Sequence, residues 1–236
     1  MALPKLNSTL LYKTTVPSTG ETVEFRPFLV GEEKLFLIAS QSESTRVLFD
    51  TIKRVVRQCI VTPDFDVERL KGYDLEYMFL QLRAKSVGEQ ENLSLLCGEC
   101  GTKNTYQIDF ENNVYVSEST GSDMVELGGG ISLRLKLPEA DEVISVQEAH
   151  TDESDIAFAM IDKIIDKVFT QEEVMVFADE APADREAFVQ SMTSTQLQLI
   201  LEFLSNAPQV SMDVSFVCGN CGKKNEMVLK GIADFF

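Results

Sequence analysis

Four cysteines in two matching Cys-x-x-Cys pairs are the residues of this sequence best suited to chemistry. They are Cys97, Cys100, Cys218 and Cys221. A glycine follows each pair directly, and glycine permits the left-handed backbone conformation that a tight thiolate knuckle commonly needs. Two such knuckles supply four thiolates, which form the closed tetrahedral ligand set of a structural zinc ion. We therefore predict one structural Zn²⁺ site that leaves no coordination position open for a substrate.

Other interpretations of the cysteines follow from the same chemistry. A single iron ion is the main alternative occupant, because four thiolates bind iron in the same geometry. A redox-active thiol pair is less favoured, since the helix N-terminus that lowers a thiol pKa is not evident beside either pair. The fifth cysteine, Cys59, ends an apolar helical stripe, so we expect a buried thiol that packs as a small hydrophobic residue.

The sequences around the two pairs indicate an internal duplication. Residues 95–104 (LLCGECGTKN) match residues 216–225 (FVCGNCGKKN). A stripe of apolar residues at helical spacing precedes each pair. These stripes are Leu75, Met78, Phe79 and Leu82 in the first half, and Leu197, Ile200, Leu201 and Leu204 in the second.

Further upstream, a longer helical stripe has the same internal spacing in both halves. It comprises Leu48, Ile52, Val55, Val56 and Cys59 in the first half, and Ala157, Ile161, Ile164, Ile165 and Val168 in the second. Before it, each half has a strand-like run, a glycine-containing turn and an extended stretch that ends in proline (residues 22–27 and 131–138), which predicts a β-hairpin. An extra helical candidate at residues 32–40 is matched only weakly in the second half.

These patterns together predict an α+β fold built from two duplicated halves, residues 1–115 and 116–236. Each half would be a β-hairpin plus helices, and a zinc-ribbon-like site of four cysteines would join the two. The polar segment 117–123 is the best candidate for a linker. Because 117 residues separate the two pairs, we expect metal binding to offset a large entropic cost of loop closure.

Composition predicts a globular and strongly acidic protein. The chain of 236 residues has 44% hydrophobic residues, 21 basic residues and 38 acidic ones, for a net charge of −17. Such a charge disfavours nucleic-acid binding and favours partners with basic patches. No apolar run reaches the ~18 residues of a membrane span, and the first residues do not resemble a secretory signal. We therefore expect a cytosolic protein without membrane contact.

No catalytic constellation stands out. The single histidine, His150, lies in a polar stretch before a predicted helix, and neither a Ser-His-Asp set nor a phosphate-binding glycine motif is present. We therefore predict a protein without enzymatic activity. Two apolar terminal segments, residues 2–11 and 231–236, are candidate contacts for a partner.

Three segments are distinctive, namely residues 2–7 (ALPKLN), 25–34 (FRPFLVGEEK) and 82–89 (LRAKSVGE). They resemble the baseplate hub assembly family of T-even-type (T4-like) contractile-tailed bacteriophages. The resemblance covers most of the first half, and the second half mainly through its knuckle. It implies a hub subunit or hub assembly chaperone that binds baseplate hub and other tail proteins. The implied location is the host cytoplasm during assembly, or the virion tail baseplate for a retained subunit.

The same segments have simple structural interpretations. We expect Arg26-Pro27 to end a strand, Glu32 to lie at a helix N-terminus, and Arg83 and Lys85 to lie at a helix C-terminus. Two other functions compete with a role in tail assembly. A zinc-ribbon regulator that binds nucleic acid would need a basic face, for which Lys53, Arg54 and Arg57 form the densest group. A thiol redox enzyme would need reactive cysteines.

Overall fold

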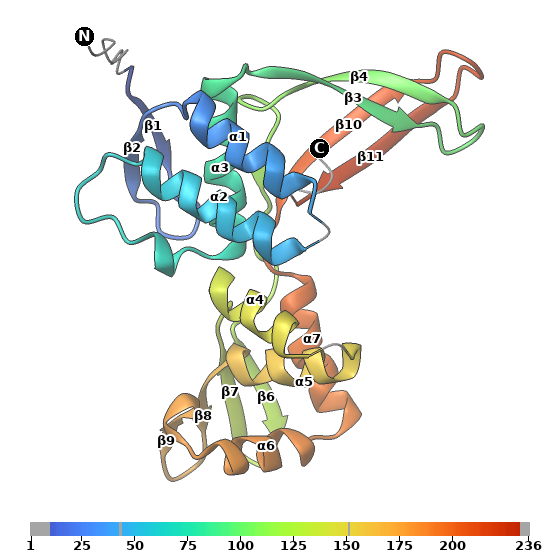
Figure 1. The fold of residues 1–236 in the computed structure, drawn as a ribbon. Coiled ribbons are helices and arrows are strands. Elements are labelled where there is room, and N and C mark those ends of the chain that lie inside the picture. Colours follow the sequence, from blue (N-terminus) through green and yellow to red (C-terminus); the bar gives the residue numbers. More distant parts are fainter. Residues whose placement is uncertain (1–9, 43, 151, 232–236) are drawn as a thin grey trace. The chain divides into compact units, whose positions relative to one another are not determined.

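A computed structural model describes residues 10–42, 44–150 and 152–231 of the chain. It contains both helices and β-hairpins, which confirms the α+β prediction (Figure 1). The chain divides into two compact units, residues 1–117 with 209–236, and residues 118–208. The second predicted repeat is therefore shared between the units, because its last hairpin belongs to the first of them. The repeat boundaries remain a prediction.

In its described part, the first unit begins with a β-hairpin and three helices. These elements are β1 (Tyr12–Thr15), β2 (Thr22–Phe25), α1 (Val30–Ser40), α2 (Thr45–Cys59), the 3-10 helix η1 (Val67–Arg69) and α3 (Gly72–Ser86). Helix α2 packs against both α1 and α3. All four members of the predicted stripe on α3 are buried, and so is Cys59 at the end of α2, as the sequence predicted.

Two long hairpins complete the first unit. They are formed by β3 (Gln90–Leu96) with β4 (Lys103–Asp109), and by β10 (Val210–Val217) with β11 (Lys224–Lys230), while the short β5 (Tyr115–Val116) pairs with β10. Alternate residues of the two hairpins share one apolar cluster, in which the rings of Tyr106 and Phe216 lie 6.5 Å apart. The hairpins therefore pack face to face, because a period of two places every second side chain on the same face.

Among its described residues, the second unit combines a four-stranded antiparallel sheet with four α-helices. Its elements are β6 (Met124–Gly128), β7 (Ile131–Leu135), α4 (Ala140–Ala149), α5 (Glu153–Ile164), β8 (Ile165–Phe169), β9 (Val174–Val176), η2 (Phe177–Asp179), α6 (Pro182–Gln190) and α7 (Ser194–Ser205). The strand order is β6-β7-β8-β9. Leu133, Ile161 and Ile200 are among the buried residues of its core, which joins the sheet to α5 and α7.

The longer helical stripe predicted for the second half was wrong at its C-terminal end. Helix α5 ends at Ile164, and both Ile165 and Val168 lie in strand β8. The chain leaves the helix because the Ile164 carbonyl accepts a hydrogen bond from the Lys136 N–H at 2.7 Å, which begins the pairing of β8 with β7. In the first half the Cys59 carbonyl accepts the corresponding bond from the Arg26 N–H at 2.9 Å. Ile164, and not Val168, thus occupies the place of Cys59.

The helix predicted at residues 32–40 has a clear counterpart, contrary to the weak match in sequence. Helix α1 follows β2, and helix α4 follows β7 at the same point of the second half. A side-chain carboxylate caps each helix from inside its first turn. Glu32 accepts the Leu29 N–H, and Glu142 accepts the Glu139 N–H, so the same capping geometry starts both helices.

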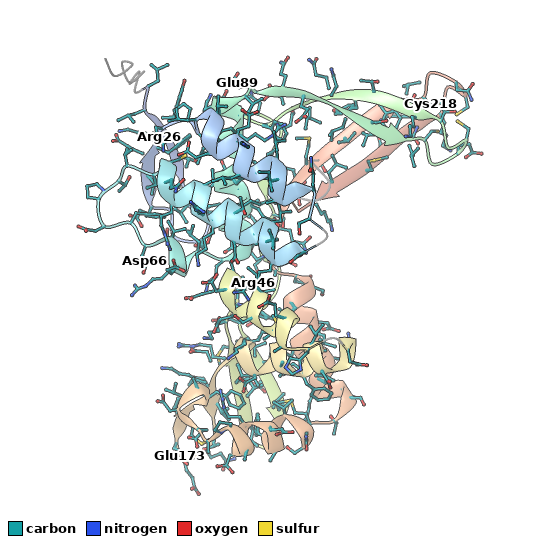
Figure 2. All side chains as sticks on the ribbon, in the orientation of Figure 1. Arg26, Arg46, Asp66, Glu89, Glu173 and Cys218 are labelled. Atoms are coloured by element: carbon teal, nitrogen blue, oxygen red, sulfur yellow. The ribbon has the colours of Figure 1, made fainter. Side chains whose placement is uncertain are left out.

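Arg26 and Glu32 join three elements of the first unit (Arg26 is labelled in Figure 2). The Arg26 guanidinium at the end of β2 lies 2.5 Å from Glu32 Oε1 and donates to the Gln58 carbonyl at 3.0 Å. Burial alone would raise the pKa of the Glu32 carboxyl group. The hydrogen bonds from Arg26 and from the Leu29 N–H outweigh burial and hold this pKa below its ordinary value of 4.5.

Arg83 and Lys85 lie in the last turn of α3, as predicted. Both also bind carboxylates near the base of the β3–β4 hairpin. Arg83 lies 2.5 Å from Glu91, and Lys85 lies 2.7 Å from both Glu89 and Glu111. These contacts fix the hairpin at the end of the helix, which gives the segment 82–89 a structural role.

We expect Glu32→Gln to lower the free energy of unfolding by about 1–3 kcal/mol at pH 7, because the Arg26 guanidinium loses its charged partner. Urea unfolding of the variant and the parent chain would measure the difference. Since the folded-state pKa of Glu32 is lowered, the difference should be complete above the unfolded-state pKa. It should disappear as the pH falls through the folded-state pKa. Glu33→Gln is the matched control, and an equal loss in both variants would contradict the link.

Candidate metal centre

The four predicted cysteines converge at the tips of the two long hairpins (Figure 2, Cys218). All four sulfur atoms lie within 4.8 Å of one another. Cys97 Sγ lies 3.7 Å from Cys221 Sγ, and Cys100 Sγ lies 3.7 Å from Cys218 Sγ. Both of these contacts join different knuckles, and each hairpin contributes two thiols to one cluster.

These distances fit a metal ion bound by four thiolates. A tetrahedral zinc ion with Zn–S bonds of about 2.3 Å separates its ligands by about 3.8 Å. A disulfide would bring two sulfur atoms to about 2.05 Å, and all four cysteines are free thiols. Each knuckle contributes one buried and one exposed cysteine. The cluster can therefore hold one metal ion, and the thiolate set alone suits zinc or iron.

The backbone of both knuckles has the same conformation. The Cys97 carbonyl accepts a hydrogen bond from the Gly101 N–H, and the Cys218 carbonyl accepts one from the Gly222 N–H, each at 2.9 Å. The φ angles of these glycines are +67° and +72°. A side chain at either position would be strained in this left-handed region, which explains the glycine after each pair.

Each knuckle is hydrogen-bonded to one asparagine of the opposite hairpin. Asn104 on β4 accepts the Gly219 N–H at 2.9 Å through Oδ1, and Asn225 on β11 accepts the Gly98 N–H at 3.0 Å in the same way. The two interactions are reciprocal, because each asparagine belongs to one hairpin and each glycine to the other. The tips are therefore held together by hydrogen bonds as well as by the cysteine cluster.

The same asparagines approach the buried thiols. Asn104 Nδ2 lies 3.6 Å from Cys218 Sγ, and Asn225 Nδ2 lies 3.5 Å from Cys97 Sγ. Amide groups that donate to a ligand sulfur stabilise its anionic form and orient it toward a metal. Both matched sequences around the cysteine pairs end in asparagine, so the signal was present in the sequence, although the prediction included only the cysteines.

Local interactions lower the pKa of two thiols of the cluster and raise the pKa of a third. The Thr102 hydroxyl group lowers the pKa of Cys100 to about 6, and the backbone N–H of Cys100 lowers the pKa of Cys97. The backbone N–H of Lys223 would lower the pKa of Cys221, but contacts with the other thiols and burial raise it to about 12. A bound cation would remove this resistance, because metal coordination deprotonates a thiol.

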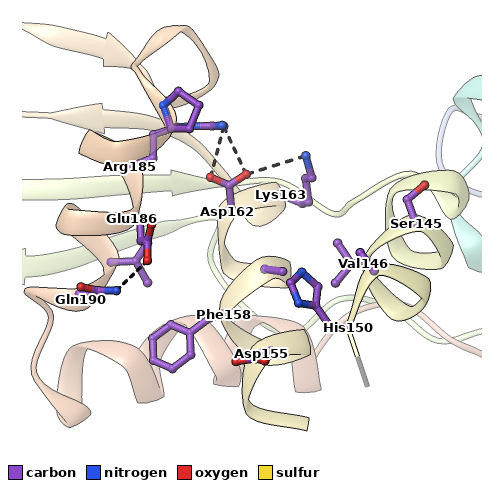
Figure 3. A pocket seen from close by; sticks show the side chains of 14 residues that line it. Ser145, Val146, His150, Asp155, Phe158, Asp162, Lys163, Arg185, Glu186 and Gln190 are labelled. Atoms are coloured by element: carbon purple, nitrogen blue, oxygen red, sulfur yellow. Dashed lines mark hydrogen bonds and ion pairs between the residues drawn. The ribbon is translucent and has the colours of Figure 1, made fainter. Parts of the chain in front are cut away.

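The other residues singled out in the sequence lie outside the cluster. Cys59 is buried, its Sγ lies 3.6 Å from Arg26 Nη1, and burial raises the pKa of its thiol to about 12. Lys53 and Arg57 both form ion pairs with Glu68, so the densest basic group is partly neutralised. His150 is half-buried after α4 and lines a pocket in residues 118–208 (Figure 3).

The terminal segments and the prediction of no membrane span are the last features of the sequence to compare with the structure. Residues 2–9 and 232–236, which include most of the candidate partner contacts at the termini, lie outside the described residues. Within the part of the chain that the structure describes, no helix is long and apolar enough to cross a membrane.

Comparison with known proteins identifies the family. The family described as T4 bacteriophage base plate protein matches residues 9–236. The chain belongs to this family. Baseplate hub assembly protein gp26 of Enterobacteria phage T4 is 23% identical over 225 residues, which cover 95% of this chain and 97% of gp26. No solved structure matches. The resemblance seen in the short segments is thus confirmed, and the family match includes the second half as well.

The reciprocal asparagines predict a double dissociation in amide exchange. Asn104→Ala should speed exchange of the Gly219 N–H roughly fivefold, the equivalent of about 1 kcal/mol for one lost hydrogen bond, and leave the Gly98 N–H unchanged. Asn225→Ala should do the reverse. Hydrogen exchange followed by NMR would measure both amides. Equal acceleration of the two amides in either variant would contradict the reciprocal arrangement.

Proposed function

We propose that this chain is a non-enzymatic adaptor that acts in assembly of the baseplate hub of a contractile phage tail. The observation that carries the proposal is membership of the base plate protein family over residues 9–236. The T4 relative, whose length is almost completely covered, is a baseplate hub assembly protein, and this supports the hub as the place of action. The partners would be hub and other tail proteins, met in the host cytoplasm during assembly.

We further propose that Cys97, Cys100, Cys218 and Cys221 bind one structural Zn²⁺ ion. The sulfur spacing and the reciprocal asparagines support this assignment. Four protein thiolates saturate a tetrahedral ion, so the site would stabilise the fold without catalysis. Its mechanical effect would be to hold the C-terminal hairpin against the β3–β4 hairpin.

An internal duplication, with repeats at residues 1–115 and 116–236, is part of the same proposal. Three matched features support it. In each half, an N–H group after a strand (Arg26 or Lys136) donates to the last carbonyl of a helix. Helices α1 and α4 have the same type of N-terminal cap, and the two knuckles have the same backbone hydrogen bonds. The proposed ion would then lie near a pseudo-twofold axis that relates the two hairpin tips.

An apolar face on α1 supports protein binding as the mode of action. The exposed fractions of Val30, Leu37 and Ile38 are 81%, 53% and 59%. These residues lie on one side of the helix, opposite the buried Phe36 and Ala39. Leu37 and Ile38 are adjacent at the surface, and exposed apolar side chains of this kind suit contact with another protein.

Metal content tests the zinc assignment directly. Protein purified without added metal should contain one zinc per chain by elemental analysis and native mass spectrometry. We expect Cys100→Ser to reduce the bound zinc at least tenfold, because a hydroxyl group cannot replace a thiolate ligand at neutral pH. Cys59→Ala is the matched control and should retain one zinc. One iron per chain would show that iron, and not zinc, occupies the site. Protein without bound metal would contradict the assignment of a metal site.

A phage that lacks this gene tests the assembly role. We expect tails without complete baseplates, and restoration by the parent chain or by the Cys59→Ala variant supplied from a plasmid. Cys100→Ser should restore assembly poorly, because the hairpin tips would lose their metal. Mass spectrometry of purified tails distinguishes a retained subunit, which is present, from a chaperone, which is absent. Normal baseplates without the gene would contradict the proposed function.

A further inference from the structure

The negative charge of the chain is concentrated in one of its two compact units. Residues 118–208 contain 19 acidic and five basic residues, which gives this unit a net charge of −14 out of −17 for the chain. The other unit is nearly balanced. A partner with basic residues would therefore be attracted mainly to residues 118–208, since the field of a surface follows its summed charge.

The same unit contains a pocket between helices α4, α5 and α6 (Figure 3). Its volume is about 760 Å³, within the range of clefts that bind ligands or side chains of a partner. Val146, Phe158 and Val189 contribute apolar surface to its lining, and the exposed fraction of Phe158 is 47%. An exposed phenylalanine inside a concave apolar surface favours burial by another molecule.

Charges around the pocket favour a cationic partner over an anionic one. The two cations that line it are already engaged, because Asp162 lies 3.2 Å from Arg185 and 3.8 Å from Lys163. Asp155 and Glu186 also line the pocket, and neither has a cationic partner among the described residues. Both residues are exposed. The apolar lining is therefore accompanied by carboxylates that can receive lysine or arginine.

We propose that this pocket binds a basic amphipathic helix of a baseplate hub protein. Apolar side chains of the helix would enter between α4, α5 and α6, while lysine or arginine beside them would pair with Asp155 and Glu186. This mode of recognition uses a groove between helices and apolar anchors at helical spacing. The inference rests on the proposed function, to which it adds the binding site and the chemistry of the partner.

Site-specific cross-linking in the full chain, co-expressed with the hub genes of its own phage, tests this inference. The photoreactive substitution Phe158→p-benzoylphenylalanine places the probe in the pocket. The same substitution at Val174, whose exposed fraction is 55%, is the matched control in strand β9. We expect a cross-link at position 158 only, to a hub segment with basic and apolar residues at helical spacing. A peptide of that segment should bind the unmodified chain.

Charge reversal separates the pocket from the overall acidity of the unit. Asp155→Lys with Glu186→Lys should weaken peptide binding at least tenfold. Glu172→Lys with Glu173→Lys changes the net charge equally at the exposed turn between β8 and β9 (Figure 2, Glu173), and should weaken binding much less. Circular dichroism and metal content would verify that both variants fold.

The outcomes distinguish the two levels of the proposal. Three results would overturn the pocket assignment and leave the assembly role intact, provided that a complex with hub proteins forms. They are equal cross-linking at both positions, an acidic cross-linked segment, and equal effects of the two charge reversals. Absence of any hub protein from the purified material would overturn both.

Discussion

Convergence of two cysteine pairs at one point is the constraint on which the rest of this structure depends. The pairs are separated by 117 residues, yet their sulfur atoms lie within 4.8 Å of one another. Closing so long a segment has a large entropic cost, which the stacked hairpins, the reciprocal asparagines and a bound metal would offset together. The consequence for the chain is that residues 118–208 form an insertion whose two ends return to the first unit.

The hairpin tips can stay together only if the hairpins are held in place at their bases. For the β3–β4 hairpin, Arg83 and Lys85 at the end of α3 hold the carboxylates near the base. The Arg26–Glu32 pair fixes the entry to α1. Two of the segments that first suggested the family, residues 25–34 and 82–89, therefore have structural roles in the first unit.

Local patterns predicted the parts of the fold that local interactions decide. The stripe on α3, the hairpin turns and the knuckles depend on residues close in sequence, and all were found where expected. The end of α5 could not be predicted in this way, because the residues that follow Ile164 pair as β8 with β7, a strand that precedes both α4 and α5 in the sequence. An apolar residue such as Val168 suits a buried strand as well as a helix.

The candidate site was predicted more completely than its surroundings. The spacing of the cysteines identified all four sulfur atoms, because knuckle geometry is local and the matching sequences around the pairs linked them. The contacts of Asn104 and Asn225 join different hairpins, so the matched asparagines gave only an indirect signal. The pocket between α4, α5 and α6 has no motif, since its lining comes from three helices that meet only in the folded unit.

X-ray absorption spectroscopy at the zinc edge of the purified full chain tests the central claim most directly. The account predicts four sulfur ligands at about 2.3 Å and no nitrogen or oxygen ligand, with loss of this signal in Cys100→Ser and its retention in Cys59→Ala. A first shell that contains nitrogen or oxygen, or cysteines oxidised to disulfides without bound metal, would contradict the claim that the four thiols form one metal centre.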